Sequence, residues 1–303
     1  MLNPSFSRDL ISFDPSAYVL PPALVEQVVR ENTAYDSGEE LRLQEVYGVE
    51  QRKKLDSLGL QEYPWREKRV LDACCGTGFL SYHLLKRSPP RTITLADINQ
   101  HEVDRAKKLI GNEKSSTAVS FLVADVLQTG LPDGSFDMII GNSFLHHFYD
   151  VPRAMREFLR LLRPGGMFVT LHEPTPAAMA VERGQIKFLL KIFFKGDGLV
   201  EEMRYAGKGI SPDGGADVWI FKKKELISLV RRADFGHVVA RDWHIARQFI
   251  VARKQLHLNS SKRELSRSEA KLLGRSISMD SILCRLLPSY LCGSVSLAAQ
   301  KPE

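Results

Sequence analysis

A carboxylate and two glycines meet where an apolar stretch gives way to a turn. The apolar stretch Val70–Ala73 contains Asp72, and Gly76 and Gly78 follow it closely. Because glycine has no Cβ, a turn built on Gly76 and Gly78 lets backbone N–H groups approach a ligand. The apolar pattern from Phe79 onward predicts a helix whose positive dipole end faces whatever lies over the turn. This strand, turn and helix are typical of nucleotide or nucleoside binding at the carboxyl edge of a parallel sheet.

The position of Asp72 argues against a dinucleotide site. A dinucleotide fold uses G-x-G-x-x-G to hold a pyrophosphate, and here Ser81 stands where the third glycine or an alanine is usual. A carboxylate at the strand end would repel a pyrophosphate, whereas it can accept a hydrogen bond from an ammonium group. A nicotinamide dehydrogenase is therefore disfavoured.

Two further predicted strands end in an acid. The segment Arg91–Asn99 reaches Asp97, and the segment Val119–Val126 reaches Asp125. A carboxylate in the first position can accept both ribose hydroxyls of an adenosine. A carboxylate in the second position suits the adenine amino group. The sequence thus predicts three acids at neighbouring strand ends.

The order and spacing of these segments resemble the class I S-adenosylmethionine (SAM)-dependent methyltransferases. The resemblance is to the branch with the ubiquinone and menaquinone biosynthesis enzymes and many small-molecule methyltransferases. It is close over residues 68–173 and looser over residues 216–243, and Cys74 replaces the first glycine of the family motif. The resemblance implies an α/β fold: a doubly wound, mostly parallel, seven-stranded, Rossmann-like sheet with helical N-terminal and lid additions.

SAM is the methyl donor that the resemblance implies, with S-adenosylhomocysteine as the product. Asp72 and the glycine turn would hold the methionine end, Asp97 the ribose, and Asp125 the adenine edge. Ile98 would pack on the adenine, and the carbonyl of Asn142 would lie near the ammonium group. The expected cofactor-binding residues are Asp72, Ala73, Cys74, Gly76, Gly78, Asp97, Ile98, Asp125, Val126 and Asn142.

The candidate catalytic residues lie where the fourth and fifth predicted strands end. Methyl transfer needs an aligned acceptor, and it needs a base when the acceptor must lose a proton. His146 is the first candidate, because imidazole titrates near neutral pH and because it is placed like the base of plant O-methyltransferases. Its neighbour His147 is a second candidate, and Glu173 could be another base or bind a substrate amine. Alternatively, the paired histidines only shape their loop. Asp150 is predicted to cap the helix that begins with Val151 and Pro152.

The chain is predicted to have a helical N-terminal cap, residues 1–67, and a SAM-binding methyltransferase domain, residues 68–303. Within that domain we expect a lid insertion at 174–215 and a helical insertion near 244–292. The amphipathic segment 185–195 of the lid insertion could cover the substrate or lie on a membrane surface. The seventh strand is either residues 249–252 or residues 294–299, and the second is favoured because it follows Gly293 and precedes Pro302.

Composition sets further limits. With 303 residues and 44% hydrophobic content, the chain can bury the core of one α/β domain with additions. It shows no signal peptide and no apolar run long enough for a membrane span, so the expected compartment is the cytoplasm. The four cysteines have no C-x-x-C spacing. We therefore predict no disulfide framework and no metal.

The net charge of +6 is concentrated in basic clusters between Lys222 and Arg275. These clusters could be a solvated face, or could attract an anionic small substrate, an acidic carrier protein or RNA. Nucleic acid is disfavoured, because aromatic residues are sparse among the clusters and no Pro-Pro-aromatic motif follows Asn142.

The sequence predicts a methyltransferase acting on a small organic acceptor, such as a natural product, quinone or lipid-like molecule, at oxygen or carbon. The alternatives are an RNA methyltransferase and a catalytically silent SAM-fold partner protein. The oligomeric state is left open.

Overall fold

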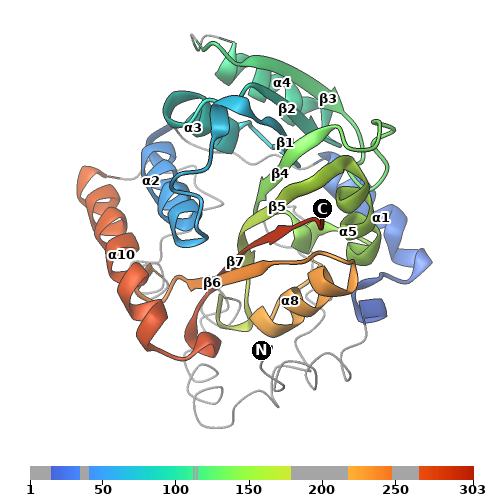
Figure 1. Ribbon diagram of the computed structural model, residues 1–303. Coiled ribbons are helices and arrows are strands. Elements are labelled where there is room, and N and C mark those ends of the chain that lie inside the picture. The colour runs from blue at the N-terminus through green and yellow to red at the C-terminus, as the bar shows by residue number, and fades with distance from the viewer. Residues whose placement is uncertain (1–14, 35–40, 112, 114, 179–217, 248–265) are drawn as a thin grey trace.

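The computed structural model describes residues 15–34, 41–111, 113, 115–178, 218–247 and 266–303. They form one seven-stranded sheet with helices on both faces (Figure 1). The strands follow the order β3-β2-β1-β4-β5-β7-β6. Their bounds are β1 Arg69–Ala73, β2 Thr92–Asp97, β3 Ala118–Val123, β4 Phe136–Asn142, β5 Leu162–Pro174, β6 Val238–Trp243 and β7 Ser294–Gln300.

Strands β1 to β5 are paired in parallel, and β7 lies antiparallel between β5 and β6. The α/β fold with a doubly wound, mostly parallel sheet is therefore confirmed. The seventh strand is Ser294–Gln300, as favoured from the sequence. The rival segment, residues 249–252, lies outside the described residues.

The helices bury one apolar side each against the sheet. Phe158 of α5, Leu229 of α8 and Val28 of α1 pack on one face of the sheet. Leu55 of α2 and Leu84 of α3 pack on the other, together with α4. The bounds are α1 Pro22–Ala34, α2 Leu41–Ser57, α3 Phe79–Arg87, α4 Gln100–Ile110, α5 Val151–Leu161, α8 Lys223–Arg232 and α10 Arg267–Leu286.

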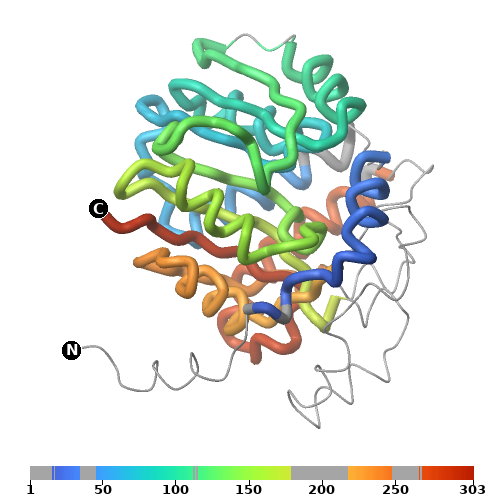
Figure 2. The backbone as a smooth tube through the Cα atoms, turned by 90° about the vertical axis from the view of Figure 1, so that its right-hand side faces the viewer, coloured from blue at the N-terminus to red at the C-terminus, as the bar shows by residue number. Residues whose placement is uncertain are grey.

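The strand directions place the ends of β1 to β5 at one edge of the sheet. Because β7 is antiparallel to β5, its first residue, Ser294, lies beside Pro174 at that same edge. The end of β6 joins them, since Trp243 pairs with Ser294. In Figure 2 the C-terminus just beyond β7 lies on one side of the molecule, and α1 (blue) lies on the opposite side. Helix α1 therefore stands near the carboxyl edge of the parallel strands.

The additions are partly described. Of the expected helical N-terminal cap, residues 1–67, the structure describes two helices, α1 and α2. Most of the expected lid, residues 179–215, lies outside the described residues. Of the expected insertion near 244–292, the structure describes residues 244–247, α10 and the short 3-10 helix Ser289–Leu291. None of the helices in the described ranges is long and apolar enough to cross a bilayer.

Candidate functional site

The turn after β1 uses left-handed backbone at three positions. Cys74 has φ 55°, Gly76 has φ 50° and Gly78 has φ 79°. The left-handed φ of Cys74 gives a physical reason why a glycine is usual there in the family motif. Gly78 precedes α3, and a Cβ on it would lie 2.8 Å from the Cβ of Ala106 in α4. The turn therefore holds α3 close to α4.

Asp72 is a buried acid at the end of β1. Its carboxylate is 1% exposed and accepts a hydrogen bond from the Ser81 hydroxyl at 2.5 Å. Burial raises the pKa of Asp72 to about 7, because the site removes water from the charged form. Ser81, the residue that departs from the dinucleotide pattern, is thus the partner of Asp72. The next residue, Ala73, is fully buried at the end of the strand.

Asp97, at the end of β2, ties its strand to the glycine turn. One carboxylate oxygen accepts the Gly76 N–H at 2.9 Å, and the other accepts the Asn99 N–H at 2.9 Å. Burial raises the pKa of Asp97 despite these hydrogen bonds. Ile98 follows and is half-buried. The acid expected to hold the ribose therefore also organises the backbone that would face the methionine end.

Asp125 follows β3 and contacts a tyrosine that the sequence analysis did not assign. Its oxygens accept the Leu127 N–H and the Tyr149 hydroxyl, each at 2.9 Å. Burial, with the neighbouring Asp125 carboxylate, raises the pKa of the Tyr149 hydroxyl to about 12. Val126 is buried beside Asp125. The signal for Tyr149 was its place three residues after His146, in the loop that follows β4.

Asn142 is the expected cofactor residue on β4. It is half-buried at the end of β4 and pairs with Leu171 of β5. A Cβ on the preceding Gly141 would lie 2.7 Å from the carbonyl oxygen of Ala73, so β4 and the end of β1 approach closely.

The arrangement fits a cationic nucleoside such as SAM. Asp72 and Asp97 are both buried, and within the part of the chain that the structure describes no basic side chain lowers the pKa of either acid. A ligand with an ammonium and a sulfonium group would supply the missing positive charge. Its ribose hydroxyls and adenine amino group are donors that suit Asp97 and Asp125.

His146 and Glu173 form a buried pair at the ends of β4 and β5. His146 lies in the 3-10 helix η4, Leu145–His147, and its Nδ1 is 2.8 Å from a carboxylate oxygen of Glu173. Glu173 is fully buried and also accepts the Thr170 hydroxyl at 2.5 Å and the backbone N–H groups of Phe144, Leu145 and His146. Burial alone would raise the pKa of Glu173, but the His146 contact and the other hydrogen bonds lower it below its usual value.

An ionised Glu173 accepts hydrogen bonds only, so His146 Nδ1 carries the hydrogen of their contact. In the neutral imidazole, Nε2 then has the lone pair that can accept a proton. The same burial leaves Glu173 no exposed surface with which to meet an acceptor. The geometry thus suits His146 to proton transfer and Glu173 to holding its ring.

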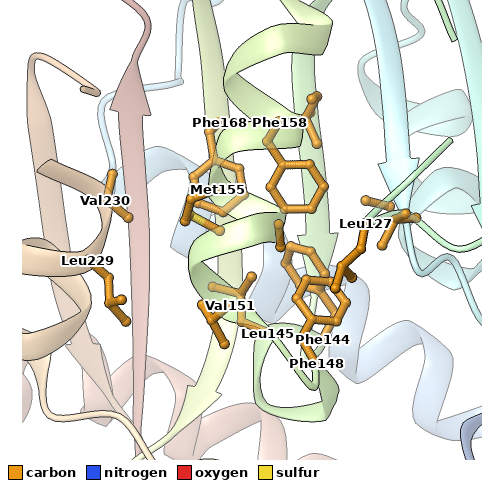
Figure 3. Close-up of a cluster of buried hydrophobic side chains, with 14 of the residues drawn as sticks. Leu127, Phe144, Leu145, Phe148, Val151, Met155, Phe158, Phe168, Leu229 and Val230 are labelled. Atoms are coloured by element: carbon orange, nitrogen blue, oxygen red, sulfur yellow. The ribbon is translucent and has the colours of Figure 1, made fainter. Parts of the chain in front are cut away.

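The loop that carries His146 is braced by apolar packing. Figure 3 shows Phe144, Leu145 and Phe148 packed with Val151 and Phe158 of α5. Asp150 caps α5 by accepting the Arg153 N–H at 2.8 Å, as predicted.

Segments far away in the chain also hold this loop. The carbonyl of His146 accepts the N–H groups of Val218 and Trp219. From α1, the Asn32 amide donates to the carbonyl of His147, whose half-buried ring lies 4.0 Å from that of His146.

A second polar cluster lies at the same edge, and sequence reasoning did not find it. Glu50 of α2, His172 of β5 and His244 after β6 bring possible metal-ligand atoms within 4.8 Å of one another. However, Glu50 is already paired with Lys54 at 2.5 Å and Arg247 at 2.7 Å. Two cations beside the carboxylate disfavour a third positive charge. Of the three residues, only His172 could be placed from the sequence, because it lies near the end of the fifth predicted strand. Glu50 and His244 reach it through packing between distant segments.

The strand order β3-β2-β1-β4-β5-β7-β6 agrees with the class I methyltransferase fold that the resemblance implied. A family model described as a methyltransferase domain matches residues 71–170. Residues 71–170 are therefore a methyltransferase domain, and SAM is the cofactor that such a domain implies.

Curated relatives match part of the chain. The chain is 31% identical over 144 residues to a demethylmenaquinone methyltransferase of Thermus thermophilus, covering 48% of this chain and 61% of that protein. It is 31% identical over 100 residues to a sterol 24-C-methyltransferase of Aspergillus fumigatus, covering 33% of this chain and 26% of that protein. The matches to three of the most similar relatives span 61%, 45% and 52% of their lengths, about half.

Solved structures share the fold. The cyclase SpnF aligns with a TM-score of 0.53 at 18% identity, covering 98% of this chain and 94% of that protein. Phosphoethanolamine N-methyltransferase 2 of Haemonchus contortus, solved with SAM, aligns with a TM-score of 0.51 at 11% identity, covering 83% of this chain and 53% of that one. One of these two proteins is named for a cyclisation, so this fold alone does not prescribe methyl transfer.

Proposed function

We propose that this protein transfers a methyl group from SAM to a small, partly apolar organic acceptor of the quinol type. The observation that carries the proposal is the His146–Glu173 pair, which lies at the ends of β4 and β5 beside the three acids. The names of the relatives support an apolar acceptor, because they refer to demethylmenaquinone and to carbon 24 of a sterol. The free cysteines among the described residues support a reducing compartment, the cytoplasm.

SAM supplies an electrophilic methyl group on its sulfur. Asp72 binds the ammonium group, Asp97 binds the ribose hydroxyls, and Asp125 with Val126 binds the adenine edge. These contacts fix where the methyl group points, and alignment of this kind is the main requirement of the displacement.

His146 acts on the acceptor. A phenolic hydroxyl of a quinol gives its proton to His146 Nε2, and the electron density left behind makes either the oxygen or a ring carbon nucleophilic. For methylation at carbon, His146 returns its proton to the oxygen and Nε2 then accepts the proton of the methylated carbon, which restores the aromatic ring. Glu173 keeps the His146 ring oriented throughout, and His147 shapes the entry to the loop.

The N-terminal helices form a cap over this site in the proposal. Support comes from α1, whose Asn32 contacts the His147 carbonyl, and from α2, whose Glu50 meets His172 and His244 at the sheet edge. Such a cap would exclude water from the displacement.

A transfer assay tests the proposal. The full-length protein is incubated with methyl-labelled SAM and either a prenylated hydroquinone, the same ring without its chain, a sterol or RNA. We expect label in the prenylated hydroquinone, and nuclear magnetic resonance of the product identifies the methylated atom. Asp97→Ala should abolish SAM binding measured by calorimetry.

Any of three results would overturn the proposal. SAM binding without transfer to any acceptor would favour a silent partner protein, and transfer to RNA alone would favour the other alternative. Failure of the native protein to bind SAM would contradict the assignment of the three acids.

A further inference from the structure

Helix α10 presents apolar side chains to solvent. Met279 is 52% exposed, Ile282 is 60% exposed and Leu286 is 76% exposed. Their spacing of three and then four residues places them on one side of the helix. Leu273 and Ile277 occupy the opposite side and are buried. The apolar exposure is therefore a continuous stripe and not a set of scattered residues.

Basic side chains flank this stripe. Lys271, Arg275 and Arg285 are exposed on the same side of α10. The two acids of the helix lie elsewhere: Glu269 closes the N-terminal capping box with Ser266, and Asp280 is fully buried. We call the exposed side the α10 outer face; it consists of Lys271, Arg275, Met279, Ile282, Arg285 and Leu286. It combines apolar and cationic groups with no carboxylate.

We propose that the α10 outer face binds an anionic lipid surface. Apolar side chains enter the boundary between headgroups and acyl chains, while lysine and arginine stay at the level of the anionic headgroups. Helix α10 lies at the edge of the molecule, beside α2 (Figure 1), and the exposure of the stripe leaves it open to a flat surface.

The charge of the α10 outer face favours a lipid surface over a second copy of the chain as its partner. A two-fold interface pairs the same patch with itself, which would bring Arg275 and Arg285 of one copy towards the basic residues of the other. No acid on the face would offset that repulsion. Three apolar side chains are also few for a stable dimer, which buries on the order of 800 Å² per partner.

The inner side of α10 connects this face to the candidate site. Asp280 accepts the N–H groups of Ile245 and Ala246, directly after His244. Beyond α10 the chain enters β7 at Ser294, which lies beside Pro174 at the site edge. A lipid contact here would place the acceptor site close to the bilayer. An acceptor dissolved in the membrane could then reach the site directly, and this step rests on the proposed function.

Vesicle sedimentation tests the contact. The full-length protein is mixed with vesicles of phosphatidylcholine alone or with added phosphatidylglycerol, and the bound fraction is measured at low and high salt. We expect binding to the anionic vesicles that weakens with salt. Arg275→Gln with Arg285→Gln should lower the partition constant by roughly tenfold or more, and so should Ile282→Ser with Leu286→Ser.

The matched controls lie on the other half of the sheet. Val123→Ser changes an apolar residue of β3 that is 44% exposed, and Arg87→Gln with Arg91→Gln removes two exposed cations. Both should bind vesicles as the native protein does. All these positions are exposed, so thermal unfolding should be nearly unchanged.

Three results would overturn the inference: no binding to anionic vesicles, equal loss in the control variants, or a native dimer that the Ile282→Ser, Leu286→Ser variant converts to a monomer. Transfer to a soluble hydroquinone, assayed without vesicles, reports separately on the proposed function. Loss of transfer with intact vesicle binding would contradict only the proposed function.

Discussion

Burial of the ionised Asp72 carboxylate destabilises the ligand-free protein, and a bound ammonium group would offset this cost. The folded protein raises the pKa of Asp72 from 3.8 to about 7, because the carboxylate is buried. The unfolded chain ionises it at its ordinary pKa, so the contribution of Asp72 to folding stability is fully present below about pH 4 and is lost as the pH rises through about 7.

We therefore expect Asp72→Asn to stabilise the SAM-free protein by roughly 2–4 kcal/mol at pH 8 while it abolishes SAM binding. The gain should shrink below pH 7 and vanish near pH 4. Urea unfolding at several pH values, with calorimetric titration of SAM, measures both effects. A variant less stable than the native protein at pH 8 would contradict the buried-charge argument.

The pair of His146 and Glu173 predicts a separation of kinetic effects. His146→Ala should lower kcat by about 10²–10³, because the base is lost, and should leave SAM affinity unchanged. Glu173→Gln should lower kcat and also shift the acidic limb of the pH profile to lower pH, because the imidazolium loses its carboxylate partner. Steady-state kinetics across pH tests this. An unchanged pH profile in Glu173→Gln would leave Glu173 with a structural role only.

At the scale of elements, the glycine turn fixes how α3 meets α4. Gly78 has a left-handed φ, and a Cβ there would lie 2.8 Å from the Ala106 Cβ and 3.2 Å from its Cα. The Cβ of Ala106 is fixed to the helix backbone, so it cannot move aside as the end of a flexible side chain could. The same turn carries the N–H groups expected to face SAM.

Gly78→Ala should cost about 2–4 kcal/mol of stability and weaken SAM binding, since left-handed strain adds to the collision. Gly130→Ala is the matched control, because Gly130 has φ 72° and nothing within 4 Å of its added Cβ. It should cost about 1 kcal/mol and leave SAM binding intact. Urea unfolding and calorimetry compare the two. Equal costs would show that only backbone strain matters at Gly78.

At the scale of the whole molecule, a buried ionic network ties the N-terminal cap to the sheet. Glu50 of α2 contacts Lys54, His244 and Arg247, and all four side chains are at most 8% exposed. Burial would raise the pKa of Glu50, but Arg247, Lys54 and His244 hold it well below its usual value. For His244, burial lowers the pKa to about 3, so the ring is neutral at pH 7.

Removing the carboxylate should therefore leave buried cations without a counter-charge. Glu50→Gln should cost about 3–5 kcal/mol. Asp56→Asn, which breaks the half-exposed Arg52–Asp56 pair on the same helix, should cost less than about 1 kcal/mol. Urea midpoints of the two variants decide this. Similar small losses would mean that the network contributes little to holding α2.

Local patterns determined the strands and the acids at their ends. Asp72, Asp97 and Asp125 each follow an apolar run, and parallel strands bring such ends to one edge, so the position of the three acids could be predicted from the sequence. Their roles towards SAM come from the family resemblance and stay predictions. The cap at Asp150 and the strand from Ser294 were also predicted, because capping and the limits set by Gly293 and Pro302 depend on neighbours in the chain.

Tertiary structure alone decided which side chains meet across distant segments. The contacts of Glu50 with His244, of Tyr149 with Asp125 and of Glu173 with His146 join separate helices, strands and loops. Tertiary structure also decided that Ile282 of α10 is exposed, because an apolar residue in a helical sequence does not reveal whether its side of the helix faces core or solvent. Sequence periodicity specifies a face, and only packing of the whole chain specifies what that face meets.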